Sequence, residues 1–101
     1  MELKLTTQKE GDMLTVFLSG ELNTTTAPEL RTLLETHIPK VNSLFLDFTD
    51  CDFVSSAGLR VLLASFKSMK SKSGIMKLRN VGENFSEVLN ITGLDAVFDI
   101  E

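Results

Sequence analysis

The chain has 101 residues, of which 43% are hydrophobic and 24% are charged, a composition typical of one folded domain and not of a disordered chain. Its formal net charge is −4, with lysines and arginines scattered along the sequence, so we expect no nucleic-acid partner. No apolar run has the length of a signal peptide or of a membrane span. We therefore expect a cytoplasmic protein with no membrane partner.

The first two elements are expected to be strands joined by a turn. Residues 2–8 alternate between apolar and polar, which indicates a half-buried strand at the edge of a sheet. Gly11 and Asp12 give a turn signal, and residues 13–19 (MLTVFLS) are apolar on both faces, as in a more central strand. Together the two segments predict a hairpin.

A helix is expected next, over about residues 27–37. Thr26 and Glu29 have the spacing of a capping box, Pro28 is allowed in a first turn, and Pro39 closes the helix. The following apolar run, residues 43–48 (SLFLDF), is short enough to predict a buried strand.

The second half of the chain continues this alternation. From Ala57 to about Lys72 the apolar residues recur at helical spacing, which predicts the longest helix. Residues 75–80 predict a strand, residues 83–94 a helix with Gly93 as its left-handed C-cap, and residues 96–100 a last short strand.

This order of elements predicts an α/β fold in a single domain over residues 1–101. We expect a mixed, mostly parallel sheet of four to five strands, right-handed crossovers and three main helices. Because strands 13–19, 43–48 and 75–80 are joined through helices, the loops that follow them meet at one edge of the sheet. Residues 23–25, 50–56 and 82–83 are therefore expected to be neighbours, at the edge where such folds place their working residues.

Two serines stand where the central helix should begin, in CDFVSSAGLRVLL (residues 51–63). One interpretation is that a hydroxyl caps the helix, which contributes about 1 kcal/mol. The other is that one serine is phosphorylated. A phosphate there would face the free N–H groups of the helix, and Gly58 would leave room for it. The residues alone leave both interpretations open.

The stretch DFVSSAGLRVLL, preceded by LFLDFTD and LSGELNTTTAPEL, resembles the STAS domain family, specifically the small bacterial anti-sigma factor antagonists. The resemblance covers essentially the whole chain. It implies that the unmodified protein binds an anti-sigma factor that is also a serine kinase, and so frees a sigma factor. It also implies that phosphorylation of one serine breaks this complex and that a serine phosphatase restores it.

Carried over position by position, the phosphorylated serine falls on Ser56, with the adjacent Ser55 as the alternative. Family members often have aspartate where this chain has Asn23 and Ser55. The resemblance implies that the partner is bound by Asn23, Thr24, Thr25, Asp52, Phe53, Val54, Ser55, Ala57, Gly58 and Arg60.

Enzyme and metal-site hypotheses have less support in the sequence. VSSAG lacks the first glycine of a G-x-S-x-G nucleophile elbow, and His37, the only histidine, lies at the far end of the first helix, so we expect no enzyme. Asp47, Asp50 and Asp52 match no calcium loop, and we expect no metal and no cofactor. Cys51, the only cysteine, is expected to be a core residue.

The spacing of Phe53, Phe66 and Phe85 suits core packing, with Phe53 and Val54 partly exposed where a partner would dock.

Some STAS domains are accessory subunits that bind a transporter ATPase or a signalling scaffold without a phosphorylation cycle. That role is the alternative function.

Overall fold

The computed structural model describes residues 2–101 and contains one five-stranded sheet with three helices, as expected. The helices are α1 (Ala27–His37), α2 (Ser56–Ser71) and α3 (Glu83–Thr92), accompanied by two short 3₁₀ helices, η1 (Ile38–Lys40) and η2 (Leu94–Ala96). The strands are β1 (Leu3–Glu10), β2 (Met13–Leu22), β3 (Ser43–Val54), β4 (Ile75–Arg79) and β5 (Asp99–Ile100).

The strands lie in the order β1-β2-β3-β4-β5. β1 pairs antiparallel with β2 through a two-residue turn in which Glu10 lies opposite Met13 and Gly11 has φ +61°. A positive φ suits glycine, which has no Cβ to clash with the backbone. β2, β3, β4 and β5 run parallel to one another. The predicted edge hairpin and parallel sheet are therefore confirmed.

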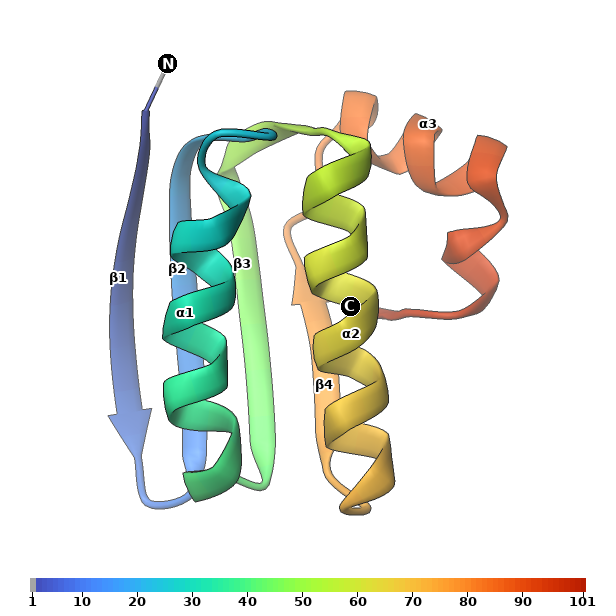
Figure 1. Ribbon diagram of the computed structural model, residues 1–101. Helices are drawn as coiled ribbons and strands as arrows, with labels where there is room; N and C mark the ends of the chain where they lie inside the picture. The colour runs from blue at the N-terminus through green and yellow to red at the C-terminus, as the bar shows by residue number, and fades with distance from the viewer. Residues whose placement is uncertain (1) are drawn as a thin grey trace.

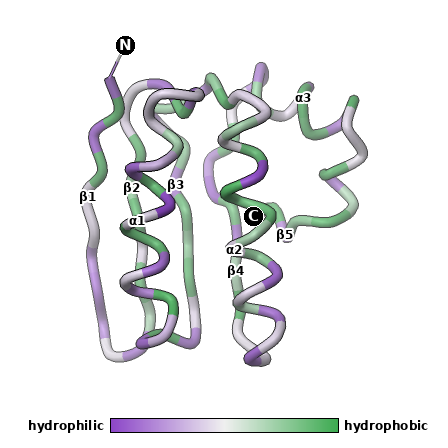
Figure 2. The backbone as a smooth tube through the Cα atoms, viewed as in Figure 1, coloured by the Kyte–Doolittle hydropathy of each residue, from purple (hydrophilic) through white to green (hydrophobic). Residues whose placement is uncertain are grey.

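The helices are unevenly placed around the sheet. α1 and α2 lie side by side over one face, whereas α3 lies to the side, beyond β4 (Figure 1). The hydropathy of the residues differs between the centre and the edge of the sheet. The central strand β3 is largely hydrophobic, whereas the edge strand β1 is largely hydrophilic (Figure 2). The core therefore lies between the sheet and the pair of helices. Within residues 2–101 we find no helix with the length and apolar character needed to cross a membrane.

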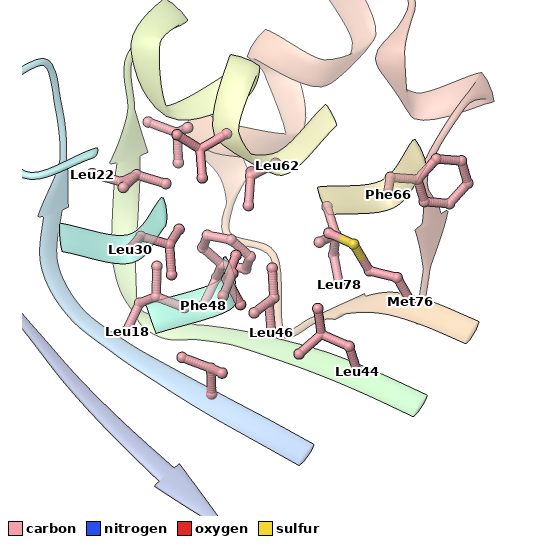
Figure 3. Packing of buried hydrophobic residues seen from close by; sticks show 14 of the residues in the cluster. Leu18, Leu22, Leu30, Leu44, Leu46, Phe48, Leu62, Phe66, Met76 and Leu78 are labelled. Atoms are coloured by element: carbon pink, nitrogen blue, oxygen red, sulfur yellow. The ribbon is translucent and has the colours of Figure 1, made fainter. Parts of the chain in front are cut away.

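Alternate residues of the central strands point into this core. Leu18, Leu46 and Leu78 from three adjacent strands face the helices, where Leu30 and Leu62 pack against them (Figure 3). Each of these side chains is at most 2% exposed. The rings of Phe48 and Phe85 pack in a tilted arrangement with their centroids 4.8 Å apart, which ties α3 to β3.

β3 is longer than the sequence indicates. The expected strand 43–48 continues to Val54, because pairing with β2 goes on past Phe48, with Ser19 opposite Asp50 and Leu22 opposite Val54. The register shifts on both sides of Ser19 let this irregular end follow β2. The loop expected over residues 50–56 is therefore mostly strand, and Ser55 alone separates β3 from α2.

The predicted capping box of α1 is wrong, although the helix begins and ends where expected. The Thr26 side chain makes no cap hydrogen bond. Its hydroxyl instead donates to the carbonyl oxygen of Glu21 at 2.7 Å and accepts from the N–H of Asn23 at 2.8 Å. The hydroxyl closes the preceding loop, so it is not available to the helix N–H groups.

The last elements follow the expected pattern with different bounds. Gly93 has φ +78° and is the left-handed C-cap of α3, as predicted. The segment expected as a strand over residues 96–100 begins with the end of η2, and only Asp99–Ile100 pairs with β4.

Candidate functional site

The loop between β2 and α1 is held in shape by its own hydrogen bonds. The side-chain oxygen of Asn23 accepts from the N–H groups of Thr25 and Thr26 at 2.9 and 3.0 Å. This is an Asx-type turn, which asparagine and aspartate form equally well because only the oxygen is used. Asn23 is thus half-buried and structural, and the loop presents Thr24 and Thr25 to solvent.

The two serines at the start of α2 have different roles. Ser55 is the N-cap: its hydroxyl accepts from the N–H of Gly58 at 3.3 Å, and its own N–H donates to the carbonyl oxygen of Leu22 at 2.8 Å. Ser56 is the first residue of the helix and is exposed. Among the described residues, the Ser56 hydroxyl forms no hydrogen bond. The structural role that the sequence allowed for either serine therefore belongs to Ser55.

Gly58 serves packing and does not open space for a ligand. A Cβ built on Gly58 would lie 2.7 Å from Cγ of Leu22 and 3.1 Å from the Leu22 carbonyl oxygen. Gly58 is buried, and α2 approaches the end of β2 at this point. The prediction that Gly58 leaves room for a phosphate is corrected, because Leu22 fills the room that the missing side chain leaves.

Asp52 caps a helix that follows it much later in the sequence. Its carboxylate accepts from the N–H of Phe85 at 3.0 Å, and from the N–H and side-chain amide of Asn84 at 3.4 and 3.0 Å. The N-cap of α3 itself is Gly82, which has no side chain for this purpose. A Cβ on Gly82 would lie 2.5 Å from the Asp52 carboxylate, so glycine lets the carboxylate reach the helix. Asp52 thus joins β3 to α3.

The residues around Asp52 alternate between core and solvent. Cys51 is 1% exposed and Val54 is 7% exposed, whereas Phe53 is 51% exposed. The expectation that Cys51 lies in the core is confirmed, whereas the expected partial exposure holds for Phe53 and not for Val54. Burial raises the pKa of the Cys51 thiol, with a further contribution from the nearby carboxylates of Asp52 and Glu21.

Asp47 and Asp52 of β3 are engaged in separate hydrogen bonds. Asp47 accepts from the backbone and hydroxyl of Thr49 and from the amide of Asn80. Burial acts to raise the pKa of Asp47, but these hydrogen bonds and the charge of Arg79 outweigh it and lower the pKa. Within residues 2–101, no three His, Cys, Asp or Glu side chains are grouped so that they could hold a metal ion.

The sheet topology brings the expected loops together at one edge, the upper edge in Figure 1. Ser55 bonds to the end of β2, Asp52 bonds to the start of α3, and Thr24 and Ala57 line the same small pocket. The side chain of Val54 and the backbone of Gly58 are buried beneath this edge. We define the edge surface as the exposed or half-exposed residues Thr24, Thr25, Phe53, Ser56, Ala57 and Arg60.

Sequence reasoning missed two features near the edge surface. The capping of α3 by Asp52 has no local signal, because the two partners are 32 and 33 residues away. Arg31 of α1 lines the same pocket as Arg60 of α2. The available signal was its position four residues after Ala27, which places the two residues on one face of α1.

Comparison with known proteins points to one family. Residues 4–101 match the family model of the STAS domain. The anti-sigma-B factor antagonist of Bacillus subtilis strain 168 is 33% identical over 93 residues, which is 92% of this chain and 84% of that protein. The anti-sigma-B factor antagonist of Listeria monocytogenes is 26% identical over 95 residues, 93% of this chain and 83% of that protein.

Solved structures show the same fold. The crystal structure of an anti-sigma factor antagonist from Mycobacterium paratuberculosis has a TM-score of 0.82 at 24% identity, covering 97% of this chain and 84% of that chain. The Bacillus cell fate determinant SpoIIAA in its phosphorylated form has a TM-score of 0.76 at 20% identity, covering 98% of this chain and 90% of that chain.

Proposed function

Because the chain belongs to the STAS domain family, and its relatives are anti-sigma factor antagonists, we propose that it binds an anti-sigma factor and thereby releases a sigma factor. The protein acts by binding and not by catalysis. Its place of action is the cytoplasm, where sigma factors work. The partner docks on the edge surface, where Phe53 and the two threonines are exposed on a strand end and on a hydrogen-bonded loop.

We further propose that phosphorylation of Ser56 switches this binding off, with the anti-sigma factor as the serine kinase and a serine phosphatase reversing the reaction. The observation that carries the assignment is the contrast between the two hydroxyls: Ser55 caps α2, whereas Ser56 is exposed and forms no hydrogen bond among the described residues. A kinase can reach the Ser56 hydroxyl without breaking a helix cap.

The proposed switch depends on charge placed within an interface. A phosphoserine carries about −1.5 to −2 charges at neutral pH. Like charges forced together across an interface cost several kcal/mol. A cost of roughly 3 kcal/mol would weaken binding about a hundredfold, since each 1.4 kcal/mol is a factor of ten. One modified hydroxyl is enough to decide whether the partner is bound.

Calorimetric titration of the purified cognate anti-sigma factor tests this function. We expect Ser56→Ala to bind about as tightly as the wild type, and Ser56→Asp to bind at least tenfold more weakly. Circular dichroism serves as the control for folding, and both variants should unfold at the wild-type temperature because Ser56 is exposed. Equal affinity of the two variants would contradict the switch.

A second experiment identifies the modified residue. Incubation with the cognate anti-sigma factor and ATP, followed by mass spectrometry, should place the phosphate on Ser56. A phosphate on Ser55 would contradict the assignment. If the anti-sigma factor does not bind but a transporter ATPase does, the chain is an accessory subunit and the proposed function is wrong.

A further inference from the structure

A groove lies on the helical side of the molecule, between α1 and α2 at its upper end and along α2 farther down. The part next to the β2–α1 loop has a volume of about 170 Å³, and the part farther along the helices about 410 Å³. Arg31, Arg60 and Val61 line both parts, so the two parts adjoin one another along α2. Ala57, which follows Ser56 directly, lines its upper end.

The side chains of the groove have a distinct composition. Its apolar lining includes Val61 and Ala64, and its cations are Arg31, Arg60 and Lys67. No acidic residue lines either part, although the chain has 14 acidic and 10 basic residues and a net charge of −4. The acidic residues of α1, Glu29 and Glu35, are not among the lining residues. Three of the ten cations are thus gathered in an otherwise acidic protein.

These three cations have no partner within the described part of the chain. The ion pairs found there join Lys77 and Arg79 to Glu101, on a different part of the molecule. Arg31, Arg60 and Lys67 are exposed, and none of them donates a hydrogen bond to another described residue. Long basic side chains cover apolar surface with their stems and keep the charged head available. The heads therefore remain free for a ligand from outside.

The geometry of the groove matches one kind of occupant. Two neighbouring helices leave a groove into which a third helix packs, and partners of this kind present apolar residues along one face. Arg60 and Lys67 are seven residues apart on α2, which is two turns or about 10.5 Å. Carboxylates seven residues apart on a helix lying along α2 have the same separation.

We propose that this groove binds an acidic amphipathic helix of the anti-sigma factor, an inference that rests on the proposed function. Apolar residues of that helix pack on Val61 and Ala64, and its carboxylates pair with Arg31, Arg60 and Lys67. The upper end of the groove adjoins Ser56, so a phosphate on Ser56 lies next to the acidic occupant and repels it. The groove extends the partner site from the edge surface along the two helices.

Charge reversal within the groove tests the proposal, with the cognate anti-sigma factor as the probe in calorimetric titrations. We expect Arg60→Glu and Lys67→Glu each to weaken binding about tenfold, because each reversal replaces an attraction by a repulsion. Lys9→Glu is the matched control. It makes the same change in net charge on the exposed end of β1, and its affinity should stay within about twofold of the wild type.

The salt dependence gives a second readout. The wild-type affinity should fall as ionic strength rises, and the affinity of the double variant Arg60→Glu, Lys67→Glu should fall less, because screening then acts on fewer attractive pairs. Thermal unfolding of every variant shows whether the fold is kept, which is expected because the substituted side chains are exposed.

The outcomes separate this proposal from the proposed function. Lys67→Glu decides between the two proposals, because Lys67 lines the groove alone whereas Arg60 also belongs to the edge surface. If Ser56→Asp loses the partner while Lys67→Glu binds like the wild type, the groove is not the docking site and the switch stands. If Lys9→Glu weakens binding as much as the groove variants, the effect is one of net charge and the groove proposal is wrong. If the wild-type protein does not bind the anti-sigma factor, both proposals fail.

Discussion

Ser55 and Ser56 are adjacent and chemically identical, yet α2 uses only one of their hydroxyls. Ser55→Ala removes the oxygen that accepts from the N–H of Gly58, so the free energy of unfolding should fall by about 1 kcal/mol. Ser56→Ala removes an exposed hydroxyl and should change that free energy by less than about 0.5 kcal/mol. Urea denaturation of the two variants measures both values. Equal losses would show that the cap is shared between the serines.

Gly58 is another residue whose role the structure defines. Gly58→Ala should destabilise the protein by about 1–3 kcal/mol, because its Cβ would overlap the Leu22 side chain at 2.7 Å in a well-packed site. The control is the same substitution in a Leu22→Ala background, where the obstructing Cγ is absent. There the cost of Gly58→Ala should be smaller. A double-mutant cycle in urea measures this coupling, and strictly additive losses would contradict the close approach.

At the scale of elements, the attachment of α3 depends on Asp52. Asp52→Ala should lower the free energy of unfolding by about 1 kcal/mol, as the loss of a helix N-cap does, and should speed hydrogen exchange of the α3 amides more than that of the α2 amides. Asp50→Ala is the matched control, because Asp50 is an exposed aspartate of the same strand. If both variants exchange alike along α3, Asp52 is not its cap.

The positions of the elements follow from local patterns, which is why the sequence predicts them well. The bounds of α1 and the C-cap Gly93 depend on proline and glycine, whose backbone preferences act within a few residues. The extension of β3 to Val54 depends instead on hydrogen bonds from β2. Nothing within residues 49–54 shows that a neighbouring strand will continue to pair there.

In the candidate site, too, some features follow from the local sequence and others only from contacts in the folded chain. The sequence places Ser55 and Ser56 at the start of a helix and Asn23 in a nearby loop, because the order of elements determines which loops share an edge. It does not show which oxygen atoms are already engaged. Asp52 was expected at the partner surface, but its carboxylate accepts hydrogen bonds from α3. Thr26 was expected to cap α1, but its hydroxyl closes the preceding loop. Both roles depend on the folded backbone.

At the scale of the whole molecule, Ser56 and the charged side chains proposed to bind a partner lie outside the core. The largest fully buried side chains come from both layers, the sheet and the helices. The edge surface and the groove between α1 and α2 consist of residues that these layers hold in place, so a charge added at Ser56 meets no packed side chain. A switch of this kind changes what the protein binds and leaves its fold unchanged.

Cys51 gives a way to test whether this edge of the molecule opens only when the whole domain unfolds. Its thiol is 1% exposed, and burial raises its pKa, so both access and thiolate formation are reduced in the folded protein. A disulfide reagent should therefore label the native protein more than about 1,000-fold more slowly than the urea-unfolded chain, since small domains are stable by about 5–15 kcal/mol.

The dependence of this labelling rate on urea separates two kinds of opening. If Cys51 reacts only after global unfolding, the logarithm of the rate rises with urea as steeply as the unfolding equilibrium, because both expose the same surface. A shallower slope would mean that the irregular end of β3 detaches by itself. We expect the steep slope, because Asp52 and Ser55, on either side of this strand end, bond to α3 and to β2. Cys51 is the only cysteine, so the wild-type chain needs no other substitution.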